Sequence, residues 1–215
     1  MKESIINIFH HIPKCGGTSV NNVLAKWFNP VRDYRKGHTL NYPDKIDLEA
    51  LSPSHCITGH FELEGFHLKQ RYPEAFTNDN CRIFSFIRDP LGVKLSLFHY
   101  ERMHNLGIAN LEEHLFSRRN YISSIFPLND ENYKQVLNQY YFIGILEYPE
   151  VSINLLATLL EKPKIQLPWK NKSIRNKNQI PITDKIIEKF KNENKLDYKV
   201  YNYCLQKFNK LRQGI

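Results

Sequence analysis

Several patterns that would assign this sequence to a common class are missing. It has four cysteines but no C-x-x-C pair, so neither a zinc ribbon nor a thioredoxin-type redox motif has support. The amino-terminal stretch MKESIINIFHHIPK contains only a short apolar run and therefore predicts neither a signal peptide nor a transmembrane anchor. From these absences we expect a reduced, cytoplasmic chain.

Internal repeats, low-complexity tracts and nucleic-acid recognition motifs are missing as well. The 215 residues suit a single domain, 1–215, with a substantial core. Lys and Arg outnumber Asp and Glu by 30 to 22, and the net charge of +8 favours an anionic partner: a nucleic acid, a polyanionic glycan, a phosphorylated cofactor or a membrane surface. Because the positive residues are scattered, a basic nucleic-acid-binding module is only an alternative.

Short apolar runs alternate with amphipathic patterns along the chain. The runs predict strands within 4–10, 55–61, 81–87 and 140–146, the second of them ending at Gly59. Helical spacing predicts helices at 18–28, from 90 onward, before 161, and at 183–193 and 196–211. Residues 29–54 and 162–181 are predicted to be irregular. Strand–helix alternation of this kind predicts an α/β fold with a three-layer, mostly parallel sheet flanked by helices.

Three residues fall just beyond the ends of predicted strands: Gly16, His60 and Arg88. In parallel α/β sheets, ligands bind at the carboxyl ends of the strands. We therefore expect three segments that are distant in sequence to converge on one crevice.

Residues 13–19, PKCGGTS, form a glycine turn between a predicted strand and a predicted helix. The nucleotide-triphosphate loop reads G-x-x-x-x-G-K-[ST], whereas here Lys14 precedes the glycines. Such a turn brings backbone amides to a helix start, where an anion can bind. The amides concerned are those of Gly16, Gly17, Thr18 and Ser19, and the side chains of Lys14, Thr18 and Ser19 can complete the site. The alternative is a turn that merely connects strand to helix.

The stretch FIRDPLGVKLSLFHY supplies a second anion site. Arg88 leaves the strand, Asp89 is a good helix N-cap, and Pro90 is a good first helical residue. Ser96 lies six residues into the helix, so that Arg88 and Ser96 can meet around one phosphate. The alternative is that Arg88 pairs with a carboxylate and Ser96 faces a neighbouring helix.

Together these stretches resemble a known family. HIPKCGGTS is similar to the 5′-phosphosulfate loop, and FIRDPLGVKLSLFHY to the 3′-phosphate motif, of sulfotransferases that use 3′-phosphoadenosine-5′-phosphosulfate. FIGILEYPEVSINLL and DYKVYNYCLQKF resemble later helices of the Golgi-type carbohydrate branch, which includes the heparan and chondroitin enzymes and bacterial relatives. The resemblance is patchy but spans nearly the whole chain. It implies a P-loop NTPase-like sulfotransferase fold.

The sequence departs from the family at two points. Cys15 stands where many members carry Thr, although contacts in this loop come mostly from backbone amides. The membrane anchor of the Golgi enzymes is missing, so the resemblance implies a soluble bacterial or viral-like member.

The resemblance also implies a reaction: in-line transfer of a sulfuryl group from 3′-phosphoadenosine-5′-phosphosulfate to a hydroxyl, with a carbohydrate as the acceptor. Lys14 would stabilise the charge on the leaving oxygen. His60 would be the general base, because members of the heparan 2-O type place a His after the equivalent strand. Glu62 or Glu64 is the substitute base, and a structural His at a strand end is the alternative. The residues expected to hold the donor are Lys14, Cys15, Gly16, Gly17, Thr18, Ser19, Arg88 and Ser96.

No metal is expected, because His55, Cys56 and His60 have no further ligand at a sensible spacing. The rival enzyme is a nucleotide or small-molecule kinase of the P-loop type. It would require the Walker order and a Mg²⁺-binding Asp beside the loop, and neither is present. Oligomeric state cannot be read from the sequence.

Minor expectations concern residues around the loop. Of His10 and His11, one is expected to point into the core and the other toward the cofactor. Cys15, beside Lys14 and a helix start, is expected to be a more reactive thiol than the other three cysteines, which we place in apolar surroundings. Four loop residues are weak candidates for acceptor contacts: Thr39, Lys45, Lys172 and Arg175.

Overall fold

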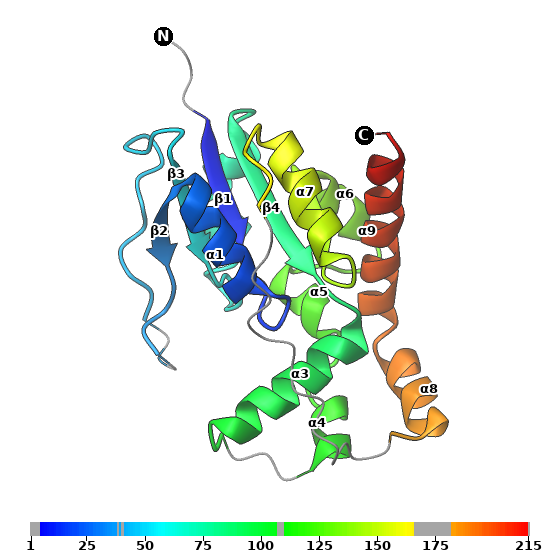
Figure 1. Cartoon of the computed structure of the whole chain (residues 1–215). Helices are drawn as coiled ribbons and strands as arrows, with labels where there is room; N and C mark the ends of the chain where they lie inside the picture. The colour runs from blue at the N-terminus through cyan, green and yellow to red at the C-terminus, as the bar shows by residue number, and fades with distance from the viewer. Residues whose placement is uncertain (1–4, 38, 40, 107–109, 166–181, 215) are drawn as a thin grey trace.

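The computed structural model describes residues 5–37, 39, 41–106, 110–165 and 182–214. It has a parallel sheet between layers of helices (Figure 1). In these residues the strand order is β2-β3-β1-β4-β5, and every pairing is parallel. The strands are β1 (Ile6–His10), β2 (Asn29–Asp33), β3 (His55–Gly59), β4 (Cys81–Ile87) and β5 (Phe142–Ile145). The predicted α/β fold with a largely parallel sheet is confirmed.

The centre of the sheet is made of β1 and β4, whose sequences are almost continuously apolar. Every residue of β1 is buried, as parallel strands covered on both faces require. Phe9 packs against Phe84 and Phe86 of the neighbouring strand, with ring centroids 5.8 and 6.3 Å apart. The predicted strands are confirmed: β4 has the predicted bounds, and the other three are slightly shorter than the apolar runs that indicated them.

The prediction of irregular structure throughout residues 29–54 is wrong, because β2 lies there. It pairs with β3 from Asn29 opposite His55 to Asp33 opposite Gly59. As an edge strand it is mostly exposed and tolerates Pro30, so it has no apolar run that would announce it.

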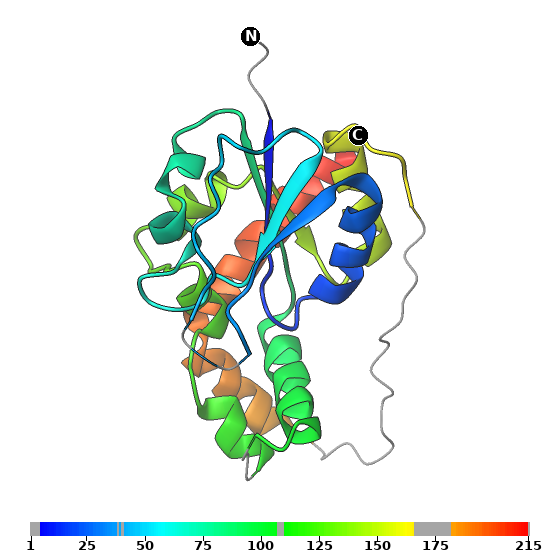
Figure 2. The same ribbon diagram turned by 90° about the vertical axis from the view of Figure 1, so that its left-hand side faces the viewer.

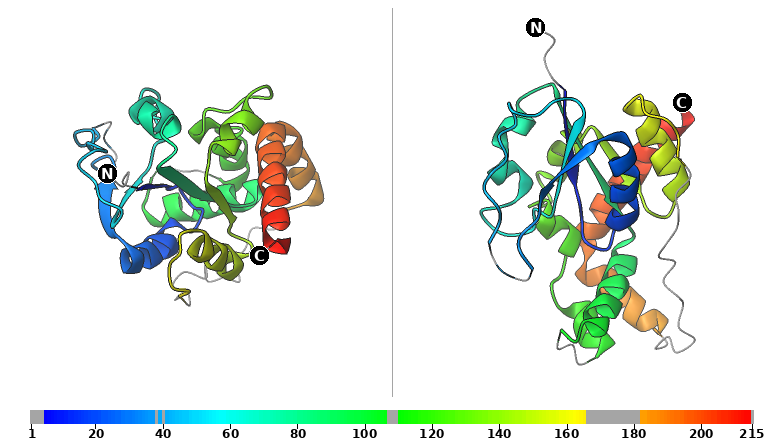
Figure 3. Two further views of the ribbon diagram at one scale, coloured as in Figure 1. Left: turned by 90° about the horizontal axis from the view of Figure 1, so that it is seen from above. Right: turned by 60° about the vertical axis from the view of Figure 1, so that its left-hand side comes forward.

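Helices cover both faces of the sheet (Figure 3). On one face lie α1 (Gly17–Trp27) and α7 (Pro149–Leu159), and on the other lie α6 (Tyr133–Asn138) and α9 (Lys195–Gln213). Shorter segments complete these layers: α2 (Leu68–Arg71), the 3₁₀ turn η1 (Pro73–Phe76) and α5 (Tyr121–Ile125). The helices predicted at 18–28, 183–193 and 196–211 are confirmed to within two residues at each end.

A further group of helices lies beyond the carboxyl ends of the strands (Figures 1 and 2). It consists of α3 (Pro90–Met103), α4 (Leu111–Phe116) and α8 (Asp184–Glu193). These helices share a small apolar cluster of their own, made of Phe98, Leu111, Leu115 and Phe190. Of the three, α3 lines the cavity at the carboxyl ends of the strands, and α4 and α8 pack against α3.

The sheet order creates a switch point between β1 and β4. The chain leaves β1 toward β2 on one side and leaves β4 toward β5 on the other. Ligands of open α/β sheets bind at the carboxyl edge of such a point. Lys172 and Arg175 of the predicted loop lie outside the described residues. None of the helices described is long and apolar enough to cross a membrane.

Candidate functional site

A cavity of about 1390 Å³ opens at the carboxyl edge of the sheet. Gly16, His60 and Arg88 all line it, which confirms the predicted convergence of three distant segments. Among the residues proposed from the sequence, those that line this cavity are Lys14, Gly16, Gly17, Thr18, Ser19, His60, Glu62, Arg88 and Ser96. Cys15 and Glu64 do not line it.

The turn between β1 and α1 leaves its helix start open. Gly16 is the N-cap residue, with a left-handed φ of 79°, and a Cβ there would lie 2.5 Å from Leu146 Cδ1. No side chain of a described residue caps the helix, and its first turn has no acidic residue. Within the described part of the chain, the amides of Gly16, Gly17 and Thr18 donate to no backbone carbonyl, whereas the Ser19 amide donates to Gly16 O at 3.0 Å. Open amides at the positive end of a helix dipole bind anions.

Lys14 and Arg88 bring positive charge to this helix start. Lys14 has a left-handed φ of 65°, and its Nζ lies 4.0 Å from the centroid of the Tyr100 ring. Burial lowers the pKa of Lys14, and the nearby Arg88 charge lowers it further. No carboxylate of a described residue lies within ion-pair distance of either cation. Partly buried cations without a counter-ion favour an anionic ligand.

The turn between β4 and α3 is closed by its own residues. Asp89 Oδ1 accepts the Gly92 amide at 2.9 Å, and Pro90 contributes no amide. The Asp89 amide donates to Glu147 at 3.0 Å. Arg88 packs over Gly92, since a Cβ there would lie 2.8 Å from Arg88 Nε. This turn therefore offers the cavity a guanidinium and not a set of amides.

Two histidines meet on the wall of the cavity. His60 Nε2 and His11 Nδ1 are 3.0 Å apart, and His11 Nδ1 is also 3.0 Å from the Tyr34 hydroxyl. Burial, followed by the charge of Arg35, lowers the pKa of His60 to about 4. Burial and then the neighbouring His60 lower the pKa of His11 well below its usual value. Both rings are therefore neutral near pH 7, and each has one ring nitrogen with a lone pair.

His10 points away from the cavity, into the core. It is buried, and its Nδ1 lies 2.8 Å from the hydroxyl of Tyr140. Burial lowers its pKa to about 3. The expectation that one of these two histidines points into the core is confirmed for His10. His11 lines the cavity, and its orientation toward a cofactor stays a prediction.

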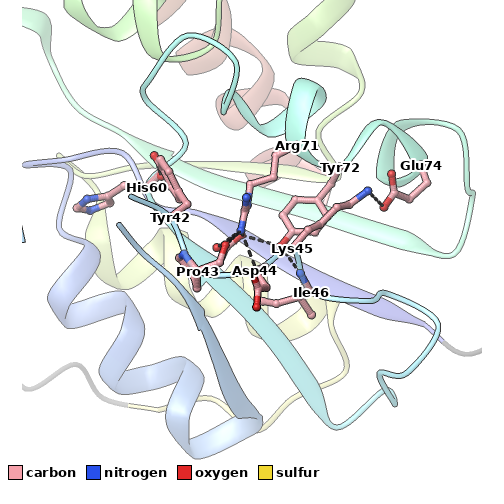
Figure 4. A network of polar contacts seen from close by, with 10 residues as sticks. Tyr42, Pro43, Asp44, Lys45, Ile46, His60, Arg71, Tyr72 and Glu74 are labelled. Carbon is pink, nitrogen blue, oxygen red and sulfur yellow. Dashed lines mark hydrogen bonds and ion pairs between the residues drawn. The ribbon is translucent and has the colours of Figure 1, made fainter. Parts of the chain in front are cut away.

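A polar network fixes the backbone at His60 (Figure 4). Tyr42 donates its hydroxyl proton to the carbonyl of His60 at 2.6 Å. Pro43 follows Tyr42 in the chain, and Arg71 donates to its carbonyl at 2.8 Å. Arg71 also forms a two-point ion pair with the fully buried Asp33, at 2.7 and 2.8 Å. The missed strand β2 ends at Asp33, so this edge strand is what anchors the wall of the site.

The two substitute bases are placed differently. Glu62 lines the cavity, but its carboxylate accepts a hydrogen bond from Arg35 at 2.7 Å and is half of an ion pair. The Glu64 side chain is 88% exposed and lies near Gln70 and His67. The structure therefore does not bring Glu64 to the site.

The expectation of a reactive Cys15 is wrong. Its side chain is 1% exposed, and burial raises the pKa of its thiol. Its amide donates to Ile12 O at 3.2 Å and is not open to an anion. The side chain turns into the core, where desolvation outweighs the stabilisation that a helix start and a cation offer a thiolate. Cys81, which we placed in apolar surroundings, is partly exposed.

Several residues of the cavity were missed from the sequence. Tyr34 and Arg35 follow β2, and recognising that edge strand would have placed them at the carboxyl edge. Arg118 and Arg119 pair with Glu101 at 3.9 Å and Glu193 at 2.9 Å, and no local pattern marks them. Two of the weak acceptor candidates, Thr39 and Lys45, do not line the cavity.

No three His, Cys, Asp or Glu side chains of the described residues come together in a way that would hold a metal ion.

Comparisons with known proteins bear on the fold. No protein-family model matches the sequence, and no curated protein matches it closely enough to count as a relative. Among solved structures, the crystal structure of a sulfotransferase from Alicyclobacillus acidocaldarius is similar, with a TM-score of 0.58 and 11% sequence identity. The match covers 93% of this chain and 95% of that one. This likeness shows the fold: the chain has the P-loop-like α/β architecture of a sulfotransferase, as the sequence predicted.

Proposed function

We propose that this protein is a sulfotransferase that moves a sulfuryl group from 3′-phosphoadenosine-5′-phosphosulfate to a hydroxyl. One observation carries the proposal: an uncapped helix start and two cations, Lys14 and Arg88, line one cavity, and neither cation has a carboxylate partner among the described residues. The shared fold with a bacterial sulfotransferase supports it.

The residues present fit such a donor. The open amides of Gly16, Gly17 and Thr18, with the Thr18 and Ser19 hydroxyls, would hold the 5′-phosphosulfate. Arg88 and Ser96 would hold the 3′-phosphate, since both line the same cavity from the next strand and its helix. Cys15 contributes packing alone, because its amide and side chain are both turned away.

Different side chains would act on the leaving group and on the attacking hydroxyl. When bound, the donor supplies an activated sulfuryl group. Lys14 stabilises the negative charge that develops on the bridging oxygen as it leaves. The paired imidazoles of His11 and His60 supply the base that accepts the proton of the attacking hydroxyl. In-line attack places these two functions on opposite sides of the sulfur.

We propose a carbohydrate as the acceptor. The resemblance to the carbohydrate branch supports this choice, and so does a cavity wall that carries Tyr34, Arg35 and Tyr121 beside the histidines. Hydroxyl-rich ligands suit a lining of hydrogen-bonding side chains and aromatic rings.

Mass spectrometry of reactions with the sulfate donor and a panel of mono- and oligosaccharides tests the function. We expect products whose mass increases by one sulfuryl group, and far less of them when Lys14→Ala protein replaces the wild type. Phosphorylated products formed from ATP would instead indicate a kinase. A panel without any sulfated product, together with no affinity for adenosine 3′,5′-bisphosphate, would contradict the proposal.

A further inference from the structure

Behind His11, three polar side chains close a ring of hydrogen bonds. Thr58 Oγ1 donates to Asn21 Oδ1 at 2.7 Å, Asn21 Nδ2 donates to Tyr34 Oη at 3.0 Å, and Tyr34 Oη lies 2.7 Å from Thr58 Oγ1. Because Thr58 gives its one proton to Asn21, Tyr34 must give its own to Thr58. If the Asn21 amide is turned over, every bond reverses and Tyr34 donates to Asn21. In both arrangements the Tyr34 proton stays inside the ring.

This ring fixes the tautomer of His11. Tyr34 Oη can only accept from His11 Nδ1, which lies 3.0 Å away, so the proton of the neutral ring is on Nδ1. The same N–H points at His60 Nε2, also at 3.0 Å. His60 must present a lone pair there, and its own proton is on Nδ1. His60 Nε2 is thus already engaged, while the lone pair of His11 Nε2 is free.

The free nitrogen of His11 faces the cavity. It accepts no hydrogen bond from a described residue, and it is not among the buried atoms that lack a partner, so it is open to the cavity that His11 lines. A Cβ on Gly17 would lie 1.6, 1.9 and 2.3 Å from Nε2, Cδ2 and Cε1 of His11. These similar distances show that Gly17 lies against the face of the ring. Gly17 therefore does not block the Nε2 lone pair, which lies in the ring plane.

We propose that His11, through Nε2, is the catalytic base of the sulfuryl transfer, and that His60 is a positioning residue; the inference rests on the proposed function. His11 Nε2 takes the proton of the acceptor hydroxyl while that oxygen bonds to sulfur and the bond from sulfur to the bridging oxygen breaks. The electron pair of the broken bond stays on the bridging oxygen, beside Lys14. The imidazolium of His11 is stabilised by Tyr34 and His60, which both accept its Nδ1–H.

The surroundings of His11 suit this role. Burial first, then His60, His10 and Lys14, lower its pKa in the free protein, so the lone pair is available at neutral pH. An anion bound at the loop would offset the Lys14 charge and favour the protonated ring when the proton arrives.

Long-range ¹H–¹⁵N NMR of the ¹⁵N-labelled protein at neutral pH tests the tautomers without any turnover. His11→Gln and His60→Gln variants assign the signals by their loss. We expect His11 to be protonated on Nδ1 and not on Nε2, and His60 likewise. A His11 ring with its proton on Nε2 would overturn the inference and leave the proposed function standing.

Kinetics of the same variants test the roles. His11→Gln should lose about 10²- to 10⁴-fold in kcat, as removal of a general base does, with affinity for adenosine 3′,5′-bisphosphate within about threefold of wild type, which also reports folding. His60→Gln should keep more activity than His60→Ala, because its amide oxygen can accept the His11 N–H. In the ¹H–¹⁵N spectrum of His60→Gln, His11 should still be protonated on Nδ1.

An active His11→Gln enzyme beside an inactive His60→Gln enzyme would assign the base to His60 and reject the proposal. A wild-type protein that binds the bisphosphate and transfers nothing would remove the proposed function, and this role with it.

Discussion

In the turn between β1 and α1, no side chain of a described residue caps the start of the helix, whereas in the turn between β4 and α3 the side chain of Asp89 caps it. In the first, Gly16 caps without a side chain, and the amides of three cavity-lining residues donate to no backbone carbonyl of a described residue. In the second, Asp89 occupies the helix start and Pro90 removes an amide. Both turns nevertheless place one cation at the cavity, Lys14 in the first and Arg88 in the second.

The difference indicates two kinds of anion site. An open helix start binds through fixed backbone dipoles, which suits a group that must be held in one orientation while it reacts. A capped helix leaves recognition to a side chain, and a guanidinium suits a phosphate that only needs to be held. We therefore propose that the reacting phosphosulfate binds at the first turn and the 3′-phosphate at the second.

The largest effect is expected at the first turn. Lys14→Ala should lower kcat about 10²- to 10³-fold, because the charge on the leaving oxygen would lose its stabilising ammonium. The measurement is sulfuryl transfer at saturating donor and acceptor. Lys45→Ala is the control, since Lys45 is paired with Glu74 outside the cavity. If Lys14→Ala and Lys45→Ala are equally active, the first turn does not handle the reacting group.

Arg88→Ala should affect binding instead. We expect adenosine 3′,5′-bisphosphate to bind about 10- to 100-fold more weakly, the range for lost charge-assisted hydrogen bonds, and adenosine 5′-phosphate to be little changed. Calorimetry on both ligands measures this. Arg82→Ala is the control, because Arg82 lies over the Tyr141 ring and does not line the cavity. Equal losses for the two ligands would reject the division between the turns.

A smaller effect is expected from Gly92→Ala. Its Cβ would displace Arg88, whose Nε lies 2.8 Å from that position. An off-rotamer side chain costs about 0.5–1.5 kcal/mol, so affinity for the bisphosphate should fall about 2- to 10-fold. Gly214→Ala, with no atom nearer than 3.8 Å, should change nothing. Unchanged affinity in Gly92→Ala would mean that the present position of the Arg88 side chain is not required for binding the bisphosphate.

The smallest effect concerns Cys15. Because it is buried and its pKa is raised, iodoacetamide should label Cys81 first and Cys15 slowly. Adenosine 3′,5′-bisphosphate should not change the rate at Cys15. Peptide mapping after brief alkylation measures both. Fast labelling of Cys15 that the nucleotide slows would put its thiol in the open turn.

The parts of the molecule that sequence predicts well are those where a local rule and the fold agree. The apolar run of β4 followed by Asp89 and Pro90 specifies a buried strand, a cap and a helix, and the structure has all three. The glycines of the first turn likewise fit the left-handed φ at Gly16 and the contact of His11 with Gly17.

The rest depends on contacts that no local pattern contains. The edge strand β2 is exposed and has no apolar period. The direction of the Cys15 side chain follows from packing after the left-handed Lys14. The ring of Asn21, Tyr34 and Thr58 joins residues 13 to 37 positions apart, so the tautomer of His11 cannot be read from the chain.

Calorimetric titration of the wild-type protein with three nucleotides tests the central claim most directly. The open turn and Arg88 together should select a ligand with both a 5′- and a 3′-phosphate. Adenosine 3′,5′-bisphosphate should therefore bind at least about tenfold more tightly than adenosine 5′-phosphate or ATP, and should not require Mg²⁺. Tighter binding of ATP with Mg²⁺, or equal binding of the monophosphate and the bisphosphate, would contradict the account.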